Sequence, residues 1–147
     1  MAPNRGDVAM LVLAAAGDAV AGIQDELQRS GFRDVRPAHG FAFVRIARGD
    51  ATSLDVAEHL GVSKQAAGKL VDQLVDRGYV VRTHDPSDRR RRPLQLTQRG
   101  RACTDGAEAA AQQVVNSWQD RLGADGVAAL RMLLQQLDLS GPIRPAW

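Results

Sequence analysis

Apolar residues recur at spacings of three and four along most of the chain, with glycine-containing turns between the runs. This periodicity predicts helices over 7–30, 37–48, 53–60, 63–77, 98–122 and 124–138. Residues 79–83 (YVVRT) and 94–96 (LQL) are instead rich in β-forming residues, and the turn cluster DPSD lies between them. The pattern therefore predicts a mainly α fold with one small β-sheet, a long two-stranded hairpin.

Short polar motifs mark the expected helix boundaries. Thr52 and Asp55 have the spacing of a capping box, in which each side chain satisfies a backbone N–H at the start of a helix. Ser63 and Thr97 are placed to cap the helices that follow them. Gly61 lies between the third and fourth helices, where a sharp reversal needs a left-handed backbone that glycine permits.

The periodicity also predicts which side chains are buried. In the second, third and fourth helices the expected buried set is Phe41, Val44, Ile46, Leu54, Val56, Ala57, Leu60, Ala67, Leu70, Val71 and Leu74. The other side of helix 63–77 is polar. Two short helices joined by a glycine turn and followed by a hairpin form a winged helix-turn-helix, whose second helix can lie in the major groove of DNA.

The first helix and the last two helices carry more apolar surface than such a small winged unit can cover. We therefore expect a winged helix-turn-helix DNA-binding domain over 37–97. Residues 1–36 and 98–147 would form a helical dimerisation domain.

The charge of the chain is concentrated in one place. The net charge is +2, but residues 82–101 contain seven arginines and two aspartates, a local charge of +5, which leaves −3 for the remainder. Arginine supplies 17 of the 19 basic residues, and its guanidinium matches phosphates and guanine edges. A basic hairpin beside a helix-turn-helix favours double-stranded DNA as the partner.

Residues 53–100 resemble the MarR-type transcriptional regulators. The segments DRGYVVR, DPSDRR and LQLTQRG have the order and spacing of that family. The resemblance implies homodimers whose first and last helices form the interface, and many members are repressors released by small, often phenolic, ligands. Pro93 departs from the family pattern and, because it lacks an N–H, predicts a shorter strand pairing.

The expected DNA-binding residues lie at two helix starts, on the fourth helix and at the wing tip. They are Thr52, Ser53, Ser63, Lys64, Gln65, Lys69, Asp88, Arg89, Arg90, Arg91 and Arg92. By motif position, Arg90 matches the family's minor-groove arginine, and Asp88 the acid that orients its guanidinium. The other three wing arginines would then serve phosphates or solvent, and Arg82 would pair with Asp85 or Asp88.

Two further features have more than one interpretation. Family geometry suggests that His39, Phe41 and Arg45 border an effector pocket. Cys103 is either a thiol redox sensor near a helix start or, since it falls on an apolar face, a buried and inert side chain. Trp118 fits the apolar stripe of its helix and is expected in the core or in an interface.

The sequence argues against several other classes. No enzyme signature such as GxSxG, HExxH or a P-loop is present, and neither a metal nor a cofactor is expected. A single cysteine excludes an intrachain disulfide framework, and the three histidines lack ligand spacing. The apolar run 8–17 is either part of a signal peptide or a buried helix of a cytoplasmic protein, and its helical continuation favours the second.

The function expected from these features is a DNA-binding regulator of the MarR type. It would act as a homodimer, most simply as a repressor, on a pseudo-palindromic operator, with release by a small effector. Two alternatives remain open: a winged-helix protein-interaction module that does not bind DNA, and a thiol-based sensor that acts through Cys103.

Overall fold

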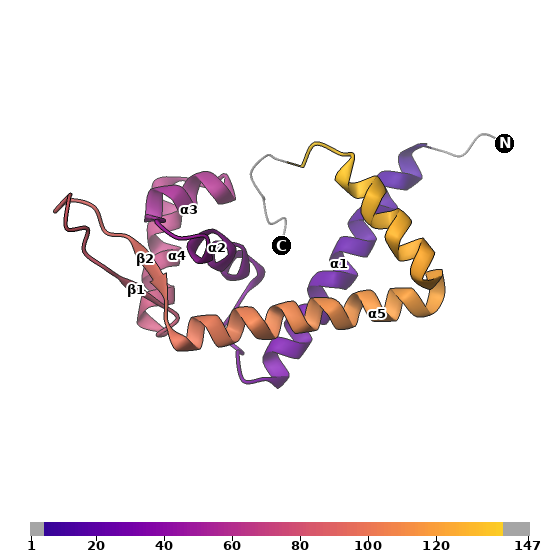
Figure 1. Cartoon of the computed structure of the whole chain (residues 1–147), viewed down its shortest axis with the longest axis horizontal. Helices are drawn as coiled ribbons and strands as arrows, with labels where there is room; N and C mark the ends of the chain where they lie inside the picture. The colour runs from indigo at the N-terminus through magenta and orange to yellow at the C-terminus, as the bar shows by residue number, and fades with distance from the viewer. Residues whose placement is uncertain (1–4, 140–147) are drawn as a thin grey trace.

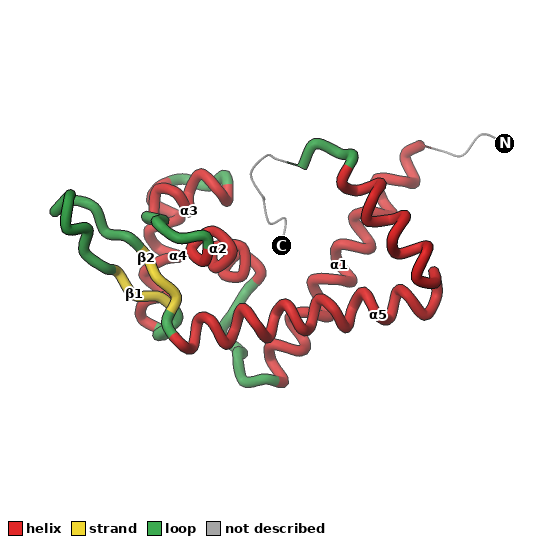
Figure 2. Tube along the Cα trace, viewed as in Figure 1, coloured by secondary structure: helices red, strands yellow, loops and turns green. Residues whose placement is uncertain are grey.

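The computed structural model describes residues 5–139, in which there are five helices and two strands. In chain order they are α1 (Arg5–Arg29), α2 (Pro37–Ala47), α3 (Ser53–Leu60), α4 (Lys64–Asp76), β1 (Val80–Arg82), β2 (Leu94–Leu96) and α5 (Gln98–Gln135) (Figure 2). The predicted mainly α fold with a hairpin wing is confirmed. The predicted helical region also includes 1–4 and 140–147, which lie outside the described residues.

The winged unit lies at one end of the molecule, and α1 with the last part of α5 lies at the other (Figure 1). α1 crosses α5 closely, since a Cβ added to Gly22 would lie 2.7 Å from Cγ2 of Val114. Gly123 divides α5 with a non-helical backbone, φ 72° and ψ 168°. The helix break predicted at this glycine is therefore confirmed, and the chain folds back toward α1 beyond it.

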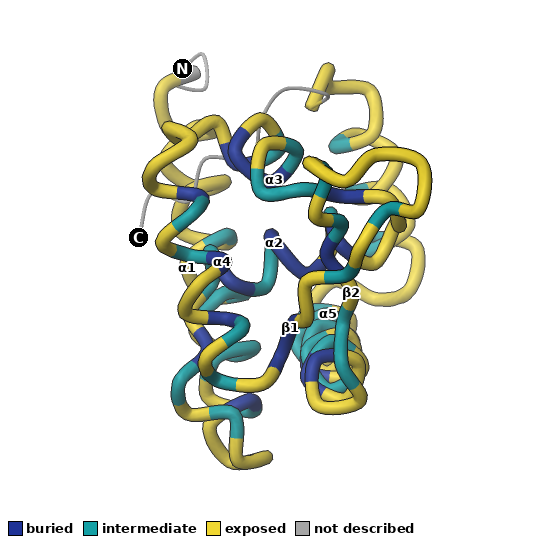
Figure 3. The backbone as a smooth tube through the Cα atoms, turned by 90° about the vertical axis from the view of Figure 1, so that its left-hand side faces the viewer, coloured by how far each residue is buried: buried dark blue, intermediate teal, exposed yellow. Residues whose placement is uncertain are grey.

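The core lies between α2, α3, α4 and the hairpin, where buried segments gather in Figure 3. Its buried members include Ala42, Phe43, Ile46, Val56, Ala57, Leu60, Ala67, Val71, Leu74, Tyr79, Val80 and Leu94. The predicted burial was wrong for two residues: Val44 is 41% exposed and Leu54 is 45% exposed. The buried face of α2 runs through Ala42, Phe43 and Ile46, and Leu54 occupies the outer side of the first turn of α3.

The two strands of the hairpin pair over a short stretch only. Only three pairs join β1 and β2, from Val80 opposite Leu96 to Arg82 opposite Leu94. The carbonyl of Pro93 still accepts a hydrogen bond from the Thr83 N–H at 2.7 Å, but proline cannot donate in return. The short pairing expected from Pro93 is thus confirmed, and the rest of the wing is loop.

A short third segment pairs with the hairpin, and the sequence did not predict it. The N–H of Leu94 donates to the carbonyl of Ala51 at 2.7 Å, which makes an antiparallel bridge on the free edge of β2. Ala51 is fully buried and directly precedes the cap of α3. The bridge therefore fixes the root of the wing against the start of the helix-turn-helix.

Candidate nucleic-acid interface

α4 has one buried face and one exposed polar face. Ala67, Val71 and Leu74 are buried, while Lys64, Gln65 and Lys69 are exposed. The Ser63 hydroxyl accepts a hydrogen bond from the Ala66 N–H at 3.1 Å, so the predicted helix cap is confirmed. The exposed side chains gather toward the N-terminal half of α4, which is the part of such a helix that reaches base edges in a groove.

The turn between α3 and α4 sets the angle at which α4 is presented. Gly61 has the left-handed backbone expected for it, with φ 63° and ψ 36°. The next residue, Val62, donates its N–H to the Ala57 carbonyl at 3.1 Å. Ala57 is buried and small, so it leaves room for the crossing of the two helices.

The start of α3 is closed by the predicted capping box. The backbone N–H and the hydroxyl of Thr52 both donate to Oδ2 of Asp55 at 2.7 Å. The hydrogen bond from the Thr52 hydroxyl is the main cause that lowers the pKa of the Asp55 carboxyl. Ser53 is half-buried at the first position of the helix. Both predicted contact residues therefore lie at the α3 N-terminus, with the Thr52 side chain engaged in the cap.

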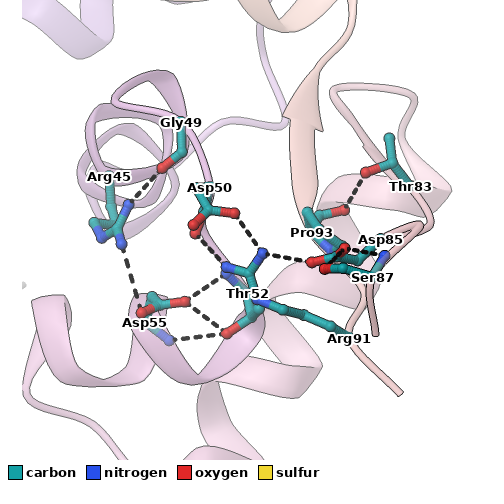
Figure 4. A network of polar contacts seen from close by, with 10 residues as sticks. All are labelled: Arg45, Gly49, Asp50, Thr52, Asp55, Thr83, Asp85, Ser87, Arg91 and Pro93. Atoms are coloured by element: carbon teal, nitrogen blue, oxygen red, sulfur yellow. Dashed lines mark hydrogen bonds and ion pairs between the residues drawn. The ribbon is translucent and has the colours of Figure 1, made fainter. Parts of the chain in front are cut away.

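Arg45 belongs to this polar network, as Figure 4 shows. Its guanidinium lies 3.5 Å from the Asp55 carboxylate and donates to the Gly49 carbonyl at 3.2 Å. The residue therefore ties α2 to the start of α3. It does not line the apolar cavity described below.

The wing loop is held by hydrogen bonds within its own turns. The Asp85 carboxylate accepts from the hydroxyl of Ser87 at 2.6 Å and from its N–H at 2.8 Å. These bonds, the hydroxyl first, and the bond from Arg91 lower the pKa of Asp85 to about 2. Asp88 accepts from the backbone N–H of Arg90 at 2.9 Å. The prediction that Asp88 holds the Arg90 guanidinium is wrong here, because a short acidic side chain bonds its own backbone two residues on.

The four wing arginines have different surroundings. Arg91 pairs with two carboxylates, those of Asp50 and Asp85. Arg92 donates to the backbone carbonyls of Arg89 and Arg91 at 2.5 and 3.2 Å. Within residues 5–139, the guanidinium groups of Arg89 and Arg90 have no hydrogen-bond or ion-pair partner and are exposed. The wing thus presents two unengaged guanidinium groups.

Arg82 does not pair as the sequence suggested. Its guanidinium lies 2.5 Å from the Asp72 carboxylate of α4, not beside Asp85 or Asp88. The reason is positional, because Arg82 is still in β1, which packs on α4, whereas the two loop aspartates are engaged in their own turns. The ion pair links the hairpin directly to α4, the helix expected to lie in the major groove of DNA.

Tyr79 is the centre of a polar cluster that sequence reasoning missed. Its ring is fully buried, and its hydroxyl donates to Asp34 at 2.6 Å. The Arg99 guanidinium lies 4.5 Å from the ring centre and donates to the Tyr79 oxygen at 3.0 Å. Arg77 donates to the Asp34 carbonyl at 2.6 Å. The cluster joins the α1–α2 loop, the end of α4 and the start of α5.

An apolar cavity of about 380 Å³ lies between α1, α2 and α5. Of the three predicted pocket residues, only Phe41 lines it. His39 is buried elsewhere and caps α2, where its Nδ1 accepts from the Arg36 N–H at 3.0 Å. Burial is the main cause that lowers the pKa of His39.

Cys103 also lines this cavity and is 1% exposed, so its predicted burial is confirmed. Burial raises the pKa of the thiol to about 11. A low thiol pKa is what a reactive cysteine requires, and the surroundings of Cys103 have the opposite effect.

In residues 5–139, no three His, Cys, Asp or Glu side chains gather as metal ligands would. The helix Gly6–Arg29, which contains an 18-residue window with a mean hydropathy of 1.6, is long and apolar enough to cross a membrane by length and composition alone.

Comparison with known proteins supports the resemblance found in the sequence. A model of the MarR family matches residues 34–91, which span α2 to the wing. No curated protein matches the sequence.

Three solved structures illustrate the structural likeness. A cysteine-to-serine variant of MarR from E. coli, complexed with operator DNA, is 23% identical, has a TM-score of 0.70 and covers 88% of this chain and 92% of its own. CouR from Rhodococcus jostii, bound to p-coumaroyl-CoA, is 27% identical with a TM-score of 0.67, covering 88% and 90%. A MarR-family transcriptional regulator from Rhodococcus sp. is 25% identical with a TM-score of 0.68, covering 92% and 96%. With the winged helix-turn-helix and the motifs that carry it, these findings show that residues 34–91 form a MarR-family domain, and that the chain has the fold of the winged-helix, DNA-binding transcription regulators of that family.

Proposed function

We propose that this protein is a homodimeric transcriptional repressor that binds a pseudo-palindromic operator. The observation that carries the proposal is the combination of an exposed Lys64, Gln65 and Lys69 face on α4 with unengaged guanidinium groups on the wing. The Arg82–Asp72 ion pair joins the two elements. Major-groove reading by a helix and minor-groove contact by a wing need such a linked pair. The MarR structure with operator DNA is similar in fold to this chain.

The DNA contacts would divide by position. Lys64, Gln65 and Lys69 would face bases or phosphates in the major groove, and Ser63 at the α4 start would approach a phosphate, where the helix dipole favours negative charge. At the α3 start, Ser53 would offer its backbone N–H to a neighbouring phosphate. Thr52 would lie beside that phosphate, with its own N–H and hydroxyl engaged by Asp55. Arg89 and Arg90 are the wing residues free to enter or flank the minor groove.

The cavity between α1, α2 and α5 is the proposed effector site. Its lining is mainly apolar, with Phe41 and Phe43 on one side and the polar groups of Thr104 and Glu108 on the other. A volume of about 380 Å³ suits a small aromatic ligand with one or two polar groups. CouR, a structural relative, is bound to p-coumaroyl-CoA. We infer that a small phenolic compound releases the protein from DNA. We also propose that the protein acts in the cytoplasm.

The decisive experiment is selection of bound duplexes from a random pool, followed by titration of the selected duplex at several salt concentrations. A palindrome with half-sites one DNA turn apart, bound with a strong salt dependence, is the expected result. Absence of salt-sensitive binding to any duplex would remove the proposal and favour a winged-helix protein-interaction module. Single-site selection without symmetry would instead remove the dimeric operator.

A further inference from the structure

The Arg91 side chain makes polar contacts that connect the wing to the α2–α3 loop (Figure 4). One of its guanidinium nitrogens donates to the Asp50 carboxylate and, at 3.2 Å, to the Asp85 carboxylate. The other donates to the Asp50 backbone carbonyl at 2.9 Å. All three acceptors therefore converge on one side chain, which is 28% exposed although it lies in a wing loop.

The backbone of Asp50 is shaped for this contact. Asp50 is the one non-glycine residue in the described range with a positive φ, 52°, and it directly follows Gly49, whose φ is 87°. A left-handed conformation costs an L-residue free energy, although aspartate tolerates it better than most. In this conformation the carboxylate and the carbonyl of Asp50 reach the same guanidinium.

The charges of this contact also distinguish Arg91 from its neighbours. Two carboxylates offset its single positive charge, whereas Arg89 and Arg90 have no acidic partner in the described part of the chain. A guanidinium already held by two carboxylates gains little from a phosphate, because it would have to give up those bonds first. The sequence-based expectation that Arg91 contacts DNA therefore fits its surroundings poorly.

We propose that Arg91 is a positioning residue, which fastens the wing to the α2–α3 loop through Asp50. It thereby holds Arg90 at a fixed position relative to α4, so that both can contact the same DNA duplex. This inference rests on the proposed DNA-binding function. The contact acts before DNA arrives, because a loop fixed in its bound position loses less conformational entropy on binding. Asp85 belongs to the same group of contacts, since its bonds with Ser87 shape the loop that carries Arg91.

The test compares Asp50→Gly with Arg91→Gln. Glycine keeps the left-handed backbone and the carbonyl of position 50 and removes only the carboxylate. If Arg91 positions the wing, both variants weaken operator binding about threefold to tenfold, and the double variant weakens it no further than Arg91→Gln alone. If Arg91 is instead a phosphate ligand, Asp50→Gly frees it and tightens binding, which would overturn the proposal.

Two controls separate positioning from charge and from stability. Glu58→Gln adds the same +1 charge as Asp50→Gly on the exposed side of α3, and we expect unchanged or slightly tighter binding. Arg91→Gln should also abolish any preference for A·T-rich flanks that depends on Arg90, with an unchanged melting temperature. A retained preference would show that Arg91 does not act through Arg90.

A measurement without DNA makes the two proposals separable. Hydrogen exchange of the wing amides should quicken in Asp50→Gly and in Arg91→Gln, but not in Arg92→Gln, whose side chain bonds only its own turn. If the parent binds no duplex, the proposed function fails, while exchange still decides whether Arg91 fastens the wing. Unchanged exchange of the wing amides in both Asp50→Gly and Arg91→Gln would refute the inference even when operator binding is intact.

Discussion

Tyr79 connects segments that lie far apart in the sequence, through one hydroxyl and one ring. Its hydroxyl donates to Asp34 at 2.6 Å, and its ring packs between Phe32 and Phe43 with centroid distances of 6.3 and 5.7 Å. Tyr79→Phe keeps the ring and removes the bond to a charged acceptor. We expect the free energy of unfolding to fall by about 1–2 kcal/mol in urea titrations, since Asp34 is partly exposed and water replaces some of the bond.

The same bond makes this effect depend on pH. The hydrogen bond from Tyr79 is the main cause that lowers the pKa of Asp34 below 3.8 in the folded protein. Its stabilisation is therefore complete above the unfolded-state pKa and is lost as the pH falls through the folded-state value. The difference between parent and Tyr79→Phe should shrink below about pH 4, and Asp34→Asn should remove that pH-dependent part. A difference that stays constant down to pH 2 would contradict this origin.

The thiol of Cys103 provides a second test at the scale of one residue. A pKa of about 11 leaves roughly one thiol in ten thousand ionised at pH 7, and the side chain is 1% exposed. We expect iodoacetamide to label the native protein at least about 100-fold more slowly than the urea-unfolded chain. Fast native labelling, together with loss of DNA binding after peroxide, would instead support the thiol-sensor alternative.

Contacts between near neighbours were predictable from the sequence, and contacts between distant residues were not. The caps Thr52, Ser63 and Thr97 follow from chemistry within three residues, and the structure confirms each of them. The Tyr79–Asp34 bond joins residues 45 apart, and no periodicity indicates it. The Arg91–Asp50 contact, 41 residues apart, likewise needed the folded wing.

Among the elements, α4 carries the expected sequence-specific contacts. Gln65 and Lys69 are exposed, and no other described side chain holds them in place. If either reaches a base edge, its replacement by alanine should weaken specific binding by about 1–3 kcal/mol and leave non-specific binding nearly unchanged. Competition titrations with operator and scrambled duplexes measure the difference, and Gln113→Ala on exposed α5 is the matched control. Equal losses on both duplexes would assign the residue to phosphates.

The wing makes a different prediction, because its guanidinium groups are not equivalent. Arg90 is exposed and unpaired within the described residues, whereas Arg92 donates to two carbonyls of its own turn. Arg90→Ala should lower operator affinity and remove the preference for A·T-rich flanks, since a narrow minor groove attracts an unpaired guanidinium. Arg92→Ala should lower affinity less and keep that preference. Parent-like binding by Arg90→Ala at physiological salt would move the minor-groove role to Arg89.

The order and type of the elements were predictable, but their pairing was less so. Helical spacing and glycine turns indicated every helix and the break at Gly123. The bridge from Ala51 to Leu94 was not indicated, because a one-residue pairing leaves no alternation in the sequence. The buried face of α2 was misjudged at Val44, since several apolar residues in a row allow more than one face.

For the whole molecule, the main unexplained feature is apolar surface without a cover. In the first half of α1, Met10 is 66% and Leu11 is 67% exposed, and Met132, Leu133 and Leu137 are exposed in and after the last part of α5. An apolar hollow of about 490 Å³ between the two parts of α5 includes Trp118 and Leu130 in its lining. Monomeric proteins rarely leave such a surface open to water. A lipid bilayer or a second copy of the chain would cover it.

The second copy fits better, because the exposed residues belong to two elements that pack on each other. α1 and α5 cross closely at Gly22 and Val114, and Trp118 donates to Asp18 at 3.5 Å. Because α1 is packed on α5, it is not free to enter a bilayer alone. We therefore expect an obligate dimer that buries more than about 2,000 Å² in total, with two α4 helices about 34–36 Å apart.

A charge introduced into this surface tests the dimer and its function together. Leu11→Glu places a carboxylate in the expected interface, where its burial without a partner is costly. Light scattering at micromolar concentration should show a dimer for the parent and a monomer for Leu11→Glu. Val81→Glu, which alters an exposed apolar residue of the wing, should remain dimeric. The monomer should keep its fold but bind a palindromic duplex no better than a single half-site, because two linked recognition helices raise affinity through effective concentration. A monomeric parent, or a dimeric Leu11→Glu, would place the interface elsewhere.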